Sequence, residues 1–136
     1  MMLSTNTKQK TLGLLVAGLT DRAVATRLGV SERTVQRYVR ALMEGAQCRN
    51  RMQLGRHAAL TGLPVSEPVP APSGRTPDRE GRQLLKALLD DACEEALRSL
   101  HMSRRSLERR IKDLMTMAGA QSRVELGWRA TLWGWV

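Results

Sequence analysis

The apolar positions of residues 18–42 repeat with the period of an α-helix, and the repeat is interrupted once, at Gly29. Either Thr20 or Asp21 can cap the helix before the interruption, in which Ala23, Val24 and Leu28 lie on one side. Gly29 suits a reversal of the chain, because a residue without a Cβ adopts a positive φ at little cost. The pattern therefore predicts two short helices joined by a sharp turn.

The helix after this turn is predicted to have one apolar and one basic face. Ser31 is placed to cap it, and an inward stripe follows at i, i+4 and i+7, consisting of Val35, Val39 and Leu42. The outer face is basic and carries one amide; its residues are Arg33, Gln36, Arg37 and Arg40. A short helix with a packed back and such a front is typical of a helix that reads the major groove, which predicts a recognition helix over residues 32–43.

One further helix is expected on each side of this pair. Residues 8–17 place their apolar side chains on one face, and the residues ahead of them are weakly specified. Asn50, followed three residues later by Gln53, is a relative of the capping box and opens a fourth helix that runs to about Leu60. We therefore expect a four-helix unit over residues 1–63.

A proline-rich stretch follows this unit. All five prolines of the chain lie within residues 64–79. Such a segment forms neither a helix nor a central strand and stays extended, so it is interpreted as a semi-stiff linker. The linker predicts a domain boundary, with a second domain over residues 80–136.

The second domain resembles the first when the sequence is shifted by 72 positions without a gap. Identical pairs include Ser31 with Ser103, Arg33 with Arg105, Arg37 with Arg109, Arg51 with Arg123, and Gly55 with Gly127. Internal similarity of this kind indicates a tandem duplication of one structural unit. The fold class expected is all-α: two small helix-turn-helix units of four helices, with a second recognition helix over residues 104–115.

Charge distinguishes the two units. The chain has a net charge of +9, so an anionic partner is expected. Residues 1–63 hold 10 basic and 3 acidic residues, whereas residues 80–136 hold 10 basic and 8 acidic ones. Four of the acids open the second helix of the second unit and would repel phosphates; they are Asp90, Asp91, Glu94 and Glu95. The first unit is therefore expected to bind DNA more strongly.

Other function classes lack support. Phe is absent and Tyr38 is the only tyrosine, which argues against a reader of unpaired RNA. The chain contains no phosphate-binding loop, metal-ligand cluster or activated nucleophile, so neither an enzyme, a cofactor nor a metal site is expected. Cys48 and Cys93 have no metal-type spacing and are interpreted as reduced core residues. Without a signal peptide or a long apolar run, the expected location is the cytoplasm, at the nucleoid, and not a membrane.

Residues 8–63 resemble the LuxR/GerE-type DNA-binding domain of bacterial transcription regulators. The resemblance rests on LLVAGLTDRAVATRLGVSERTVQRYV and on the later RNRMQLGRHAALTGL. One departure is Lys8, which stands near the start of the first helix where the family usually has an acid.

The resemblance implies DNA-contacting residues in the first unit, and the repeat extends them to the second. Base contacts are expected from Gln36, Arg37 and Arg40, and from Glu108, Arg109 and Lys112. Phosphate contacts are expected from Thr20, Arg33, Thr34 and Arg51, and from Arg105, Ser106 and Arg123. Leu97 and His101 replace Ala25 and Gly29 of the first unit, so a wider or strained turn is expected there.

Two functions fit these observations. The first is a sequence-specific regulator of transcription that binds double-stranded DNA through both units. The alternative is a DNA-tethered adaptor whose second unit binds RNA polymerase or another regulator. By resemblance, the fourth helices would pair, within one molecule or in a homodimer. Trp128, Trp133 and Trp135 are interpreted as a pairing or partner surface, with core filling as the alternative.

Overall fold

The computed structural model describes residues 4–62 and 76–136, which form α-helices and no strand. The helices are α1 (Thr5–Val16), α2 (Asp21–Leu28), α3 (Glu32–Gly45), α4 (Arg51–Leu60), α5 (Arg79–Leu89), α6 (Cys93–Ser99), α7 (Arg104–Ala118) and α8 (Arg123–Leu132). The all-α fold class is therefore confirmed. We call α1–α4 the N-terminal half and α5–α8 the C-terminal half.

Several predicted helix boundaries need correction. The first helix begins at Thr5 rather than near residue 8, because the Ser4 hydroxyl accepts a hydrogen bond from the backbone N–H of Thr7. The recognition helices run two or three residues further than expected, to Gly45 and Ala118. Residues 64–75 of the predicted linker lie outside the described part of the chain. Its last residue, Arg79, already belongs to α5.

The caps that the sequence predicted are present. Thr20, Ser31 and Asn50 each accept a hydrogen bond from a backbone N–H three residues ahead, at the start of α2, α3 and α4. Gly29 ends α2 with a φ of 69°, as the predicted reversal requires. These local signals account for where the chain turns, and packing decides how the helices meet.

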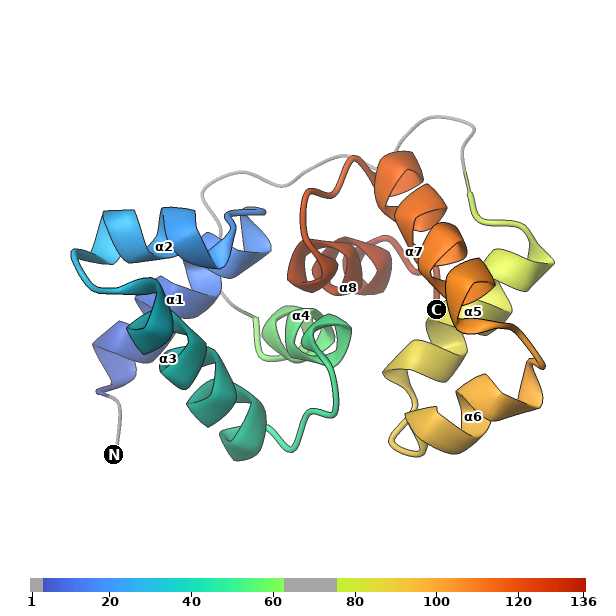
Figure 1. The fold of residues 1–136 in the computed structure, drawn as a ribbon, viewed down its shortest axis with the longest axis horizontal. Helices are drawn as coiled ribbons and strands as arrows, with labels where there is room; N and C mark the ends of the chain where they lie inside the picture. The colour runs from blue at the N-terminus through green and yellow to red at the C-terminus, as the bar shows by residue number, and fades with distance from the viewer. Residues whose placement is uncertain (1–3, 63–75) are drawn as a thin grey trace.

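The centre of the molecule is the contact between α4 and α8. These two helices lie against one another, with α1–α3 on one side and α5–α7 on the other (Figure 1). A Cβ built on Gly55 would overlap the carbonyl oxygen of Val124, and one built on Gly127 would overlap that of Met52. Met52 and Val124 are 72 positions apart, as are the two glycines, so the contact is reciprocal. The fourth helix of each half, α4 or α8, therefore lies at the centre of the molecule and is not an appendage of its half.

Each of these helices also completes the hydrophobic core of the other half. Val124 and Trp128 of α8 are buried with the core residues of α1–α4, and Met52 of α4 is buried with those of α5–α8. Trp128 keeps 3% of its surface exposed. Neither half can bury its apolar surface without the other, so hydrophobic burial couples the folding of both.

Polar contacts across the centre are reciprocal as well. Around the end of α5 at Leu89, backbone carbonyl groups lack helical partners, and side chains at the start of α4 donate hydrogen bonds to them. Asn50 Nδ2 donates to the Leu88 carbonyl at 2.8 Å, and Gln53 Nε2 donates to the Asp90 carbonyl at 2.8 Å. In the other direction, Ser122 Oγ donates to the Leu15 carbonyl at 3.3 Å. The start of each central helix thus binds the end of the first helix of the other half.

We predict that Gly55→Ala and Gly127→Ala each lower the free energy of unfolding by about 3 kcal/mol or more, because the added methyl group meets rigid backbone. The measurement is chemical denaturation followed by circular dichroism. Gly13→Ala in α1 is the matched control, since its Cβ would meet no atom within 4 Å. This control should gain up to about 1 kcal/mol from helix propensity. Equal stability of Gly55→Ala and wild type would contradict the close approach.

Candidate nucleic-acid interface

The outer face of α3 has the composition and the accessibility of a DNA-reading surface. Val35, Val39 and Leu42 are buried, as their spacing predicted. This fixes the rotation of the helix, and the opposite residues are exposed: Arg33, Gln36, Arg37 and Arg40. Within the described part of the chain, none of these four side chains makes a hydrogen bond or an ion pair. Their donors are therefore available to a ligand such as duplex DNA.

The residues at the start of α2 and α3 frame this face. Thr20 is exposed, and its hydroxyl caps α2 by accepting from the Ala23 N–H at 3.2 Å. The hydroxyls of Ser31 and Thr34 are hydrogen-bonded to each other at 2.9 Å. Both threonines were predicted to contact phosphates, and those contacts stay predictions, since capping already explains the residues.

Arg51 has a partner that the sequence did not reveal. Its two terminal nitrogens donate to the two carboxylate oxygens of Asp21, each at 2.7 Å. Donating these hydrogen bonds to Asp21 raises the pKa of Arg51, although partial burial acts in the opposite direction. This bidentate pair joins the first residue of α4 to the first residue of α2. The predicted phosphate contact of Arg51 stays a prediction, and the guanidinium has a structural role in its absence.

The outer face of α7 carries more basic residues but also an internal ion pair. Ser103 caps the helix as Ser31 caps α3. Arg123, at the start of α8, is half-buried. The other side chains of this half that are predicted to contact DNA are exposed: Arg105, Ser106, Glu108, Arg109 and Lys112. Arg123 donates to Glu108 Oε2 at 2.6 Å. A predicted phosphate contact and a predicted base contact therefore bind each other in the free protein.

The turn before α7 differs from its counterpart in the N-terminal half. His101 adopts a φ of 53°, the left-handed conformation that Gly29 adopts, and a side chain makes this conformation unfavourable. The predicted strain at this turn is therefore present. In addition, α2 packs closely on α3, whereas α6 packs mainly on α5.

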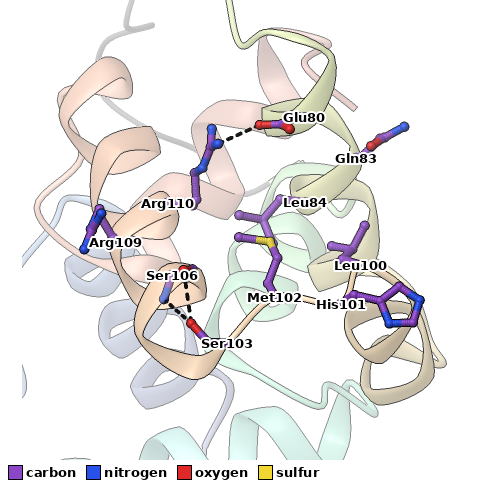
Figure 2. Close-up of a pocket in the computed structure, with 10 residues that line it drawn as sticks. All are labelled: Glu80, Gln83, Leu84, Leu100, His101, Met102, Ser103, Ser106, Arg109 and Arg110. Carbon is purple, nitrogen blue, oxygen red and sulfur yellow. Dashed lines mark hydrogen bonds and ion pairs between the residues drawn. The ribbon is translucent and has the colours of Figure 1, made fainter.

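A pocket of about 390 Å³ lies where α6 leaves α7 uncovered. Figure 2 shows Leu84, Leu100 and Met102 in its middle, and the ion pair of Arg110 with Glu80, at 2.6 Å, along one side. Arg110 stands 72 positions after Tyr38, which is half-buried in α3. The exchange of an aromatic ring for an exposed guanidinium therefore accompanies the looser packing between α6 and α7.

The tryptophans are divided between the two cores. Trp128 is buried in the N-terminal core and Trp135, 4% exposed, in the C-terminal core, so neither indole is offered to an outside partner. Trp133 is half-buried, with its ring centroid 5.0 Å from that of Trp135 and 5.8 Å from the Arg129 guanidinium carbon. Trp128 thus packs from α8 into the core of the opposite half, and Trp135 fills the core of its own half.

Other chemistry receives little support from the described residues. Residues 4–62 and 76–136 contain no group of three or more His, Cys, Asp or Glu side chains that could hold a metal ion. Cys93 is buried, Cys48 is half-buried, and burial raises the pKa of the Cys48 thiol. None of the described helices combines the length and the apolar character needed to cross a bilayer.

Comparison with known proteins identifies the N-terminal half. Residues 3–58 match the family model described as "Bacterial regulatory proteins, luxR family" (GerE). The match covers α1–α3 and most of α4, less than half of the chain, and α5–α8 lie outside it. No curated protein and no solved structure matches the chain. The matched family consists of DNA-binding transcription regulators and not of enzymes, which agrees with the exposed basic face of α3.

We predict that Arg51→Lys lowers the free energy of unfolding by about 1 kcal/mol, because one ammonium group cannot reproduce two parallel hydrogen bonds to Asp21. Thermal unfolding measures the effect. Arg27→Lys is the matched control, since Arg27 is exposed and makes no ion pair in the described structure. Equal unfolding temperatures for the two variants would show that the Asp21 contact contributes nothing.

Proposed function

We propose that the chain is a sequence-specific regulator of transcription that presents two recognition helices, α3 and α7, to one DNA duplex. The observation that carries this proposal is the reciprocal packing of α4 on α8. Helices of matched sequence meet through matched glycines, as the two subunits of a symmetric dimer would. One chain then supplies what two subunits supply in a regulator that binds a two-fold operator.

The correspondence between the helices of the two halves supports this proposal. The caps Ser31 and Ser103 accept from the N–H three residues ahead at the same distance of 3.1 Å. The C-terminal half contains four helices whose lengths follow the same order along the chain as those of the N-terminal half. On this basis the domains would be residues 1–63 and 80–136, joined by the proline-rich segment.

Tethering would give the paired arrangement its affinity. Two recognition helices about one turn of DNA apart read half-sites roughly 10 base pairs apart. Once the first helix is bound, the local concentration of the second is about millimolar, so a weak second contact still adds to the affinity. The N-terminal half, with its larger positive charge, would bind first and the C-terminal half second. Because α8 already covers α4, the pairing surface is used within the chain and not for a homodimer.

A DNA-tethered adaptor is the second candidate. It is favoured by the acidic residues Asp91, Glu94 and Glu95, all exposed around α6, and by the ion pair of Glu108 with Arg123 on the face of α7. Acidic groups in these places oppose phosphates and suit a basic protein surface, such as that of RNA polymerase or another regulator. The two candidates differ in whether α7 contributes to DNA affinity.

We predict that the double variant Arg37→Ala, Arg40→Ala lowers affinity for a duplex selected from random sequence by the wild-type chain about a hundredfold, because two base-facing cations are lost. Arg109→Ala with Lys112→Ala should lower it about tenfold. Both effects are measured by fluorescence anisotropy at several salt concentrations, and each double variant should give a shallower dependence on salt than wild type. The control is Arg82→Ala, an exposed cation on α5, which should bind as wild type does.

The results separate the candidates. Unchanged DNA affinity of the Arg109→Ala, Lys112→Ala variant, together with loss of a protein contact, would favour the adaptor. Unchanged affinity of the Arg37→Ala, Arg40→Ala variant would contradict DNA recognition by α3 altogether.

A further inference from the structure

We propose that Glu108 makes the two half-sites different, by accepting a hydrogen bond from a cytosine amino group at the position where Gln36 contacts an adenine. This inference rests on the proposed function, since it concerns the bases that α3 and α7 read. It identifies a specificity-determining residue and the base pair that it selects.

Gln36 and Glu108 occupy equivalent positions on the two helices. Each lies five residues after the capping serine. Each also follows directly after a residue of the inward stripe, which is Val35 in α3 and Leu107 in α7. The stripe continues to buried residues four positions on in both helices, at Val39 and Ile111. The rotation of the two helices relative to their cores is therefore the same, and both side chains are exposed on the outer face.

The chemistry of the two side chains differs in one respect that bases detect. An amide has a donor and an acceptor, which matches N7 and the N6 amino group of adenine. An ionised carboxylate only accepts, which matches the N4 amino group of cytosine. Guanine offers only acceptors at this edge and thymine offers an acceptor and a methyl group, so a carboxylate disfavours both. One substitution in an otherwise similar face therefore changes the preferred base pair.

Arg123 allows a carboxylate to stand on a surface that faces phosphates. Its guanidinium donates to Oε2 of Glu108, whereas Oε1 accepts no hydrogen bond from the described residues. Both side chains are about half exposed, at 43% and 53%, so the ion pair adds little to stability. Its effect is to neutralise the negative charge and to hold the free oxygen on the outer face. Arg123 is in this sense a positioning residue.

The N-terminal half shows why Arg123 is available for this task. The equivalent residue, Arg51, binds Asp21 at the start of α2. The start of α6 has Cys93 in that place, and a buried thiol cannot pair with a guanidinium. Arg123 therefore has no carboxylate at this position of α6 to bind, as Arg51 binds Asp21, and it forms its ion pair with Glu108. The Gln36 side chain, by contrast, makes no hydrogen bond with another described residue.

The test is Glu108→Gln in the full-length chain, with binding measured to duplexes in which each base pair of the selected site is varied in turn. At one position of one half-site, the preference should change from a C·G to an A·T pair by about tenfold. The two half-sites then have the same preferred base pair at that position. Gln36→Glu is the matched variant and should produce the opposite change in the other half-site. Both substitutions are on the exposed surface, and circular dichroism confirms that the variants are folded.

Retained DNA binding with unchanged base preference in Glu108→Gln would overturn this inference and leave the proposed function standing. Failure of the wild-type chain to bind any duplex at low salt would overturn the proposed function, and this inference with it.

Discussion

The structure depends on how closely the backbones of α4 and α8 approach one another. Gly55 and Gly127 place no side chain at the two points where the backbones meet, and each glycine lies against a carbonyl group of the opposite helix. At this separation the neighbouring residues reach beyond their own half, so that Trp128 and Val124 are buried in one core and Met52 in the other. Any side chain at either glycine would push the helices apart and expose these residues. The two halves are therefore held in one arrangement by backbone contact, hydrophobic burial and the hydrogen bonds at the helix ends.

The two halves, although fixed against each other, differ in packing and in their surface groups. The N-terminal unit has a tightly packed α2 and α3 and a basic outer face without internal ion pairs. In the C-terminal unit α6 has moved away from α7, the turn contains a strained His101, and Glu108 and Arg123 bind each other. In the proposed function, the C-terminal half contributes to DNA binding through its high local concentration, and its different outer face supplies different specificity.

Local signals were predictable from the sequence, and contacts between distant residues were not. Thr20, Ser31, Asn50 and Gly29 act on neighbours within five residues, so their capping and turning roles could be inferred directly. The stripe of Val35, Val39 and Leu42 gave the rotation of α3 for the same reason. By contrast, the partners of Arg51 and Trp128 lie on other helices, and no spacing along the chain indicates them. The signal for the central contact was present as the repeated pair Leu54-Gly55 and Leu126-Gly127. Its meaning depended on knowing that the two helices face each other.

In the proposed function one chain supplies both reading helices to one site, and the stoichiometry of the DNA complex is the decisive test. A duplex selected from random sequence would be mixed with the full-length chain, and the mass of the complex would be measured by light scattering alongside a nuclease footprint. We expect one chain per duplex, with protection of two half-sites about one helical turn apart. Two chains on the same site, or protection of a single half-site, would contradict it.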